Sequence, residues 1–281
     1  MSDHLLLTCP DRPGIVSAVT GFLAEREHNI VELDQFSESG QLVMRVAFDH
    51  AGSHERIDRE FREEVGEPLG AKWRIVHANR MRKVVLMASR EDHCLHDILS
   101  RASRGEILAD VTSVISNHPD SRELAESHGI PFHHLPVTKD TKREAEDAAL
   151  EVMRSDPPEL VILARYMQIL SPEFLAAIHE MGAAVINIHH SFLPAFAGGN
   201  PYERAYERGV KMIGATAHYV TADLDEGPII EQDVARVDHS MTVDDLTAIG
   251  RDTESQVLAR AVKWHSEHRV LLNGHRTVVF R

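Results

Sequence analysis

The sequence lacks any long uncharged apolar run, and no segment approaches the ~18 apolar residues that a membrane-spanning helix needs. The first residues, Met1-Ser2-Asp3-His4, have neither the basic stretch nor the apolar stretch of a secretory signal peptide. We therefore expect a cytoplasmic protein that does not interact with a membrane.

Cysteine and positive charge are also scarce. Cys9 and Cys94 are the only cysteines, which excludes a disulfide framework and a four-cysteine metal site. The 30 Lys and Arg residues are outnumbered by 44 Asp and Glu, so the formal net charge is −14. Because proteins that bind a phosphate backbone need clustered Lys and Arg, we expect no nucleic-acid partner.

The first part of the chain has a βαββαβ pattern. Apolar residues alternate in the expected strands and recur at helical spacing in the expected helices. This order is typical of a ferredoxin-like domain, which we expect to span residues 1–80. The expected elements, in order, are Leu5–Thr8, Ile15–Arg26, Ile30–Phe36, Leu42–Phe48, Ser53–Val65 and Trp73–Val76.

The second part, residues 83–281, has strands separated by helical segments, a pattern that predicts an α/β domain with a mostly parallel sheet. A long helix from Thr242 to His268 follows the strands, and the tail Arg276–Phe280 is expected to add an edge strand. The expected strands are Val84–Ala88, Val111–Ser116, Leu160–Leu163, Ala184–Ile188 and Ile213–Val220.

Three polar residues mark a candidate catalytic site. Asn187 and His189 end one expected strand, and Asp225 follows another. Since ligands bind beyond the carboxyl ends of strands in such sheets, we expect these residues to share one cleft. An amide, an imidazole and a carboxylate together can stabilise an oxyanion and take a proton from a nucleophile, which indicates acyl transfer or acyl hydrolysis. His190 is expected to face away from His189.

Zinc catalysis is an alternative interpretation of the histidine-rich segments. His189, His190, His218, His239 and Asp225 are all possible ligands. However, no helix near them carries a His-x-x-x-His pair, and neighbouring strand residues point apart. We therefore expect no metal in the site.

Several motifs together resemble known families. Asn187-Ile188-His189, Ser191-x-Leu193-Pro194 and Asp223-x-Asp225-x-Gly227 resemble the folate-dependent formyltransferases, and Leu163–Pro172 is similar to their folate-binding segment. Asp11-Arg12-Pro13-Gly14-Ile15 resembles the ACT domain, a ferredoxin-like module that often binds amino acids. The two domains in this order, with Asn187 to Phe196 as they stand here, resemble the formyltetrahydrofolate deformylases.

The resemblance implies hydrolysis of 10-formyltetrahydrofolate to formate and tetrahydrofolate, with no prosthetic group. Catalysis would fall to Asn187, His189 and Asp225, while His218 would order the water or tune Asp225. A folate site, an effector site for an amino acid, and a homo-oligomer (dimer or tetramer) are also implied. The implied folate-binding residues are Arg165, Tyr166, Met167, Gln168, Ile169 and Leu170, and the implied effector-binding residues are Asp11, Pro13, Gly14 and Ile15.

The nature of the acceptor follows from a departure from the family pattern. Ser89 to Cys94 contains two carboxylates and no glycine, whereas the related transferases hold a phosphorylated acceptor there with a Gly- and Ser-rich loop. Such a segment is a poor anion site, which favours water as the acceptor. A transferase to an unphosphorylated amine and a non-catalytic amino-acid sensor stay open as alternatives. The product could serve purine synthesis, or the reaction could recycle tetrahydrofolate within one-carbon metabolism.

Overall fold

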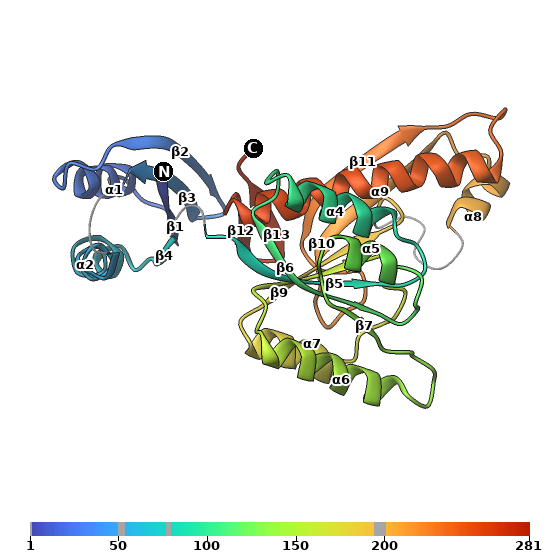
Figure 1. Cartoon of the computed structure of the whole chain (residues 1–281). Helices are drawn as coiled ribbons and strands as arrows, with labels where there is room; N and C mark the ends of the chain where they lie inside the picture. Colours follow the sequence, from blue (N-terminus) through green and yellow to red (C-terminus); the bar gives the residue numbers. More distant parts are fainter. Residues whose placement is uncertain (1, 50–53, 77–79, 194–200) are drawn as a thin grey trace. The chain divides into compact units, whose positions relative to one another are not determined.

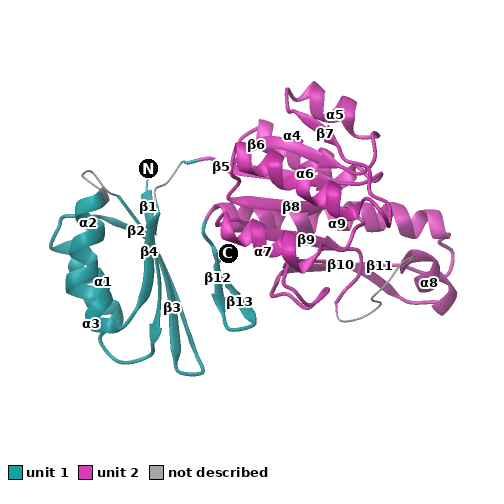
Figure 2. Ribbon diagram, turned by 90° about the horizontal axis from the view of Figure 1, so that it is seen from below, with its two compact units in different colours: residues 1–80, 268–281 teal, residues 81–267 magenta. Residues whose placement is uncertain are grey.

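The computed structural model describes residues 2–49, 54–76, 80–193 and 201–281. Contacts divide the chain into two compact units, Met1–Arg80 with His268–Arg281, and Met81–Glu267 (Figure 2). The units differ from the sequence-based division at the C-terminal end, because residues 268–281 belong to the first unit. Each unit is described separately below.

The first unit contains the expected βαββαβ pattern, as an antiparallel sheet with strand order β2-β3-β1-β4. Its ferredoxin-like fold is therefore confirmed. The elements are β1 (Ser2–Pro10), α1 (Ile15–Ala24), β2 (Ile30–Glu38), β3 (Gln41–Asp49), α2 (His54–Phe61), the π-helical stretch η1 (Arg62–Gly66), α3 (Glu67–Leu69) and β4 (Lys72–Val76).

Strand alternation gives this sheet two apolar faces. Leu5 and Leu7 of β1 point to the helical face, where they join Val19, Phe22 and Phe61 in one buried cluster. Residues of opposite parity point to the other face, and this second face is covered by a hairpin from the C-terminal end of the chain.

The hairpin consists of β12 (Val270–Asn273) and β13 (Arg276–Val279), which form a two-stranded sheet of their own among the described residues (Figure 1). Leu271 and Phe280 are buried in one cluster with Leu6 and Val43. The expectation of an edge strand at Arg276–Phe280 was therefore wrong. Apolar residues on both faces of the first sheet need a cover, and the hairpin supplies it for the face away from the helices.

The second unit is built on a seven-stranded sheet with strand order β11-β10-β9-β8-β5-β6-β7. Its elements are β5 (Arg82–Ala88), α4 (His93–Ser103), β6 (Ala109–Ser116), α5 (Arg122–Ser127), β7 (Phe132–His134), α6 (Lys142–Ser155), β8 (Leu160–Ala164), α7 (Pro172–Glu180), β9 (Ala184–His189), α8 (Pro201–Arg208), β10 (Met212–Tyr219), β11 (Ile229–Arg236) and α9 (Val243–Ser266).

The five strands from β9 to β7 are parallel, and β10 and β11 are antiparallel to their neighbours. Helices α6 and α7 cover one face of the sheet, and α4 and α9 cover the other (Figure 1). This confirms the expected α/β class with a mostly parallel sheet. The antiparallel strands end the series and place the loop between β10 and β11 next to β9.

The long helix α9 begins with a reciprocal cap. The Thr242 hydroxyl accepts the Asp245 backbone N–H, and the Asp245 carboxylate accepts the Thr242 backbone N–H. Val257, Leu258 and Val262 are buried on its inner side. No helix within the described ranges is both long and apolar enough to cross a membrane.

Candidate active site

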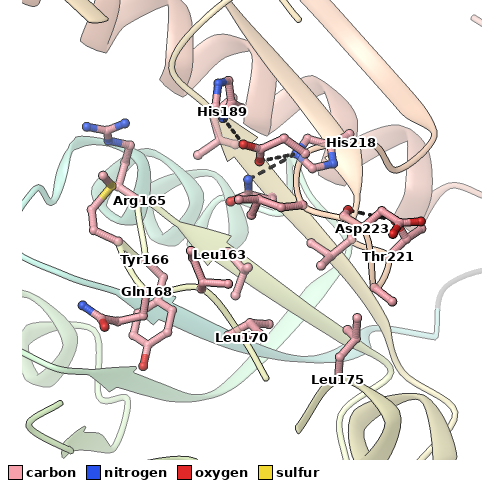
Figure 3. Close-up of a pocket in the computed structure, with 18 of the residues that line it drawn as sticks. Leu163, Arg165, Tyr166, Gln168, Leu170, Leu175, His189, His218, Thr221 and Asp223 are labelled. Atoms are coloured by element: carbon pink, nitrogen blue, oxygen red, sulfur yellow. Dashed lines mark hydrogen bonds and ion pairs between the residues drawn. The ribbon is translucent and has the colours of Figure 1, made fainter. Parts of the chain in front are cut away.

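The residues expected in the catalytic and folate sites line one pocket in the second unit, with a volume of about 460 Å³. Figure 3 shows His189 and His218 at one end of this pocket and Leu170 and Leu175 at the other. Asn187, Asp225 and the whole segment 165–170 also line it. The structure thus brings together every residue that the sequence assigned to catalysis and folate binding.

Asn187 is oriented by His218 on the adjacent strand, since β9 and β10 place the two residues opposite each other. The His218 Nδ1 lies 2.9 Å from the Tyr219 carbonyl oxygen, which can only accept, so Nδ1 carries the hydrogen. In the neutral ring the Nε2 then accepts from the Asn187 amide at 3.2 Å. Burial lowers the pKa of His218, which favours this neutral form and fixes the direction of the amide.

His189 and Asp225 are in contact, and they form an ion pair when the imidazole is protonated. The Nδ1 of His189 lies 3.4 Å from Oδ2 of Asp225, and the Nε2 of His218 lies 3.7 Å from Oδ1. The hydrogen bond from His189 is the main cause that lowers the pKa of Asp225, and it outweighs the effect of burial. The carboxylate is therefore held ionised between two imidazoles.

Asp225 does not reach the site in the way that the sequence argument assumed. Strand β10 is antiparallel to β9, so its carboxyl end is not at the edge where β9 ends. The loop between β10 and β11 folds back, and it is held by a hydrogen bond from the Tyr219 N–H to the Pro228 carbonyl oxygen. A Cβ added at Gly227 would lie 1.7 Å from the Tyr219 carbonyl oxygen, so only glycine fits this turn.

His190 was expected to face away from His189, and this was wrong. Its ring lines the same pocket and stacks on His189 with centroids 4.9 Å apart and planes inclined by 17°. The Arg165 Nη1 lies 2.5 Å from the His190 Nδ1. Strand alternation fails here because His189 is the last residue of β9, and the backbone beyond it is no longer extended in the sheet.

The segment 165–170 links β8 to α7 and leaves the sheet at Arg165, which has a φ of 62°. Met167 and Ile169 are 52% and 62% exposed, so the segment presents apolar side chains to the solvent, a feature often found where a ligand binds. The Met167 N–H already donates to the Ser89 hydroxyl at 3.0 Å, so this amide is not available to a ligand. Ser171 caps α7 by accepting the Phe174 N–H.

Two groups of residues that line the pocket or contact its lining were not predicted from the sequence. The loop residues Val220 to Leu224 also line the pocket, and the Asp-x-Asp-x-Gly turn was the signal that could have found them. Glu254, in the middle of α9, lies 3.3 Å from the Arg165 Nε. Nothing in its local sequence distinguishes it from a surface residue of a polar helix.

The set of residues considered for zinc does not converge as a whole. His189, His190, His218 and Asp225 line the pocket, but His239 does not. Within the described part of the chain, the ligand atoms close enough to share an ion belong to His93, Cys94 and Glu254. Glu254 already has Arg165 and Tyr202 as partners, so its carboxylate charge is balanced without an ion.

The expected effector residues lie together in the first unit. Asp11, Pro13, Gly14 and Ile15 line one hollow with Thr20 and Gln35. Gly14, with a φ of 96°, precedes the first turn of α1. The Ile15 side chain is 1% exposed and belongs to the core, and proline has no N–H, so a ligand here would meet the backbone of Gly14 and Ile15.

The chain is similar to known proteins over nearly its whole length. Residues 82–262 match the family described as formyl transferase, and residues 4–63 match the ACT domain. The formyltetrahydrofolate deformylase of Mycobacterium bovis is 53% identical over 99% of this chain and 90% of its own length, and that of Bacillus subtilis is 49% identical over 99% and 93%. The crystal structure of a formyltetrahydrofolate deformylase from Pseudomonas syringae pv. tomato has a TM-score of 0.94 and 43% identity, and the match covers 100% of this chain and 94% of that one.

Proposed function

Because this chain belongs to the formyltetrahydrofolate deformylase family, it hydrolyses 10-formyltetrahydrofolate to formate and tetrahydrofolate, and we propose that Asn187, His189 and Asp225 carry out the reaction. The observation that carries this proposal is the His189–Asp225 ion pair beside Asn187 in the pocket of segment 165–170. The comparisons favour the hydrolase over the transferase and the sensor.

Asp225 acts as the general base. Its pKa is lowered mainly by the hydrogen bond from His189, so it is ionised at neutral pH. It removes a proton from a water molecule, whose oxygen attacks the formyl carbon. General base catalysis of this kind contributes roughly 10²–10⁴-fold to the rate.

Asn187 and His189 stabilise the oxyanion. The Asn187 amide is held by His218 at 3.2 Å, which leaves its second N–H for the formyl oxygen. Protonated His189, paired with Asp225 through Nδ1, donates from Nε2, which has no hydrogen-bond partner among the described residues. One such donor contributes about 3–4 kcal/mol in the transition state. Collapse of the intermediate breaks the C–N bond, and the nitrogen of tetrahydrofolate takes the proton.

Water is the acceptor because the segment 89–94 is unsuited to a phosphate. Glu91 of this segment pairs with Arg251 at 2.8 Å, and His93 pairs with Glu254. The Ser89 hydroxyl donates to Asn117. These contacts occupy Ser89, Glu91 and His93, and the segment has no glycine-rich backbone cradle for an anionic substrate.

The test is turnover of 10-formyltetrahydrofolate without any added acceptor, measured as formate and tetrahydrofolate. Asp225→Asn should lower kcat by roughly 10²–10⁴-fold, because the general base is lost. The matched control is Glu226→Gln, the same change of charge at the next, exposed residue, which should leave kcat unchanged. Release of tetrahydrofolate that depends on an added amine, with the formyl group recovered on that amine and not as formate, would contradict the hydrolase.

We also propose that the first unit binds an amino acid. The backbone N–H groups at the start of α1 and the Asp11–Ile15 hollow suit its carboxylate. A panel of amino acids should contain one that changes activity and raises Tm. Unchanged activity across the panel would exclude regulation by an amino acid.

A homo-oligomer, a cytoplasmic location, the absence of a prosthetic group and a role in formate supply for purine synthesis or in tetrahydrofolate recycling complete the proposal. They rest on the sequence and on the family. The mass of the protein in solution tests the homo-oligomer, and a strictly monomeric protein would contradict it.

A further inference from the structure

Glu254 is a buried carboxylate with three partners, and the reaction as proposed does not use it. Its side chain is 1% exposed. His93 Nε2 donates to it at 2.8 Å, Arg165 Nε lies 3.3 Å away, and the Tyr202 hydroxyl donates to its other oxygen. Burial alone would raise the pKa of Glu254, but these hydrogen bonds and the Arg165 charge lower it.

Arg165 connects this carboxylate to the active site. Its side chain is 12% exposed, and its Nη1 lies 2.5 Å from His190 Nδ1. A guanidinium group has only donors, so His190 Nδ1 must accept. The neutral ring of His190 therefore carries its hydrogen on Nε2. A proton on Nδ1 would place two donors and two positive charges against each other.

His190 in turn touches the catalytic imidazole. Its ring is stacked on His189 with centroids 4.9 Å apart, and His189 pairs with Asp225. Two protonated rings at this distance repel each other. A proton on His190 would therefore hinder protonation of His189 and compete for the charge of Asp225.

We propose that Glu254 and Arg165 are positioning residues that hold His190 as the neutral Nε2–H tautomer, so that His189 is the ring of the pair that takes the proton beside Asp225. The charge on Glu254 fixes Arg165, Arg165 occupies Nδ1 of His190, and the stacked pair then carries at most one positive charge. The kinetic part of this inference rests on the proposed role of His189, and the tautomer does not.

Groups from six segments bear on the protonation of the stacked pair, either by contact with one of its rings or through Arg165, Asp225 or Glu254. They are Arg165 after β8, His93 on α4, Tyr202 on α8, His218 on β10, Asp225 in the following loop and Glu254 on α9. Arg165 is the cation among them that meets His190 directly. Its removal therefore gives the sharpest test.

The first measurement is the tautomer of His190 in the unchanged protein, by NMR of ¹⁵N-labelled histidines, with His190→Asn to assign the signals. We expect an unprotonated Nδ1 and a protonated Nε2 that stay the same from pH 8 down to pH 6, the range around the ordinary histidine pKa of ~6.5. A hydrogen on Nδ1, or protonation of both nitrogens in this range, overturns the proposal. This measurement does not need turnover. It therefore decides the tautomer of His190 even if the proposed reaction is wrong.

The second measurement is the pH profile of kcat/KM in Arg165→Met, His190→Asn and the double variant. In Arg165→Met, Nδ1 of His190 is free to take a proton, so kcat/KM should show an additional fall on the acid side, of ~10-fold for each pH unit once His190 is protonated. Asparagine cannot be protonated there but still accepts a hydrogen bond through its side-chain oxygen. His190→Asn alone should therefore keep the original shape of the profile, and the double variant should lose the additional acid-side fall.

Binding of tetrahydrofolate separates this effect from the place of Arg165 in the pocket wall. The Kd of tetrahydrofolate for Arg165→Met, measured at each pH, gives the loss of binding. The proposal predicts a pH-dependent loss in kcat/KM in addition to this loss of binding. A loss of equal size at every pH overturns the proposal. An acid-side fall that persists in the double variant does so as well.

Discussion

Two residues at the site have a positive φ without being glycine, Arg165 at 62° and Asp225 at 58°. Such conformations are uncommon for residues with a Cβ, and they persist where the surroundings hold them. Arg165 is held by Glu254 and His190, and Asp225 is held by His189 and His218. At the residue scale, the same side-chain contacts that place the reacting groups also stabilise the backbone that carries them.

The protonation of His218 sets a limit on activity at low pH. Burial lowers its pKa, so the neutral ring persists below the ordinary value of ~6.5. Once protonated, Nε2 no longer accepts from Asn187, and kcat/KM should fall on the acid side with an apparent pKa below ~6.5. His218→Asn should have a lower maximum but no such fall, as measured by a pH profile from 5 to 8. The same acid limb in the variant would show that another group titrates.

The lowered pKa of His218 also affects the stability of the fold. Between the folded and the unfolded pKa of His218, the unfolded chain binds more protons than the folded one, so the free energy of unfolding decreases as the pH falls. The contribution of His218 to the free energy of unfolding is fully present above its unfolded pKa. It is lost as the pH falls through its lower, folded pKa.

Replacement of Gly227 should change the active site through the position of the loop that carries Asp225. Because an added Cβ would lie 1.7 Å from the Tyr219 carbonyl oxygen, Gly227→Ala must move the loop that carries Asp225. We expect kcat/KM to fall at least ~10-fold, since misplacement by about 1 Å costs up to 10²-fold. Gly21→Ala in α1 is the control, because nothing lies within 4 Å of its added Cβ and alanine favours the helix. Equal activity of both variants would contradict a role for loop position.

At the scale of elements, the sequence predicts most helices and strands because their apolar patterns are clear, as in the continuous apolar run of β8 and the helical spacing of apolar residues in α9. It does not predict β11, where Glu231, Gln232 and Asp233 interrupt the apolar pattern. It also does not predict the reversal of β10, since alternation has the same period in parallel and antiparallel strands. The residues of the site were predicted correctly although β10 was expected to run parallel to β9. Asp225 could be identified because it lies in a turn motif that is recognisable by itself.

The helix α9 gives a prediction at this scale. Thr242→Ala removes the reciprocal cap with Asp245 and should lower the free energy of unfolding by about 1 kcal/mol. Thr247→Ala is matched in residue type and helix, but its hydroxyl only donates back to the Val243 carbonyl oxygen. This second change should be nearly neutral. Urea unfolding measures both, and equal effects would contradict the capping contribution.

At the scale of the whole molecule, the first unit is built from both ends of the chain. The sequence could not show this, because the apolar residues of the hairpin have the same pattern whichever sheet they cover. Leu271 is 7% exposed in the cluster with Leu6 and Val43, and its neighbour Leu272 is 56% exposed. Two adjacent leucines in one strand therefore have opposite environments.

This pair gives a direct test of the shared unit. Leu271→Ala should lower the free energy of unfolding by roughly 2–3 kcal/mol, as expected for a buried leucine. Leu272→Ala should change it by less than about 0.5 kcal/mol, because it is on the surface. Both values come from thermal or urea unfolding of the full chain. Similar values for the two would mean that the hairpin does not cover the sheet in solution.

The shared unit also has a consequence for the order of events on the ribosome. Residues 268–281 emerge after the whole of residues 81–267. All strands of the second unit have therefore been made while the face of the first sheet that carries Leu6 and Val43 is still uncovered. A nascent chain therefore carries the exposed apolar side chains of Leu6 and Val43 until synthesis is nearly finished. During this interval the N-terminal unit, although made first, is the one that exposes apolar surface of the kind that promotes aggregation.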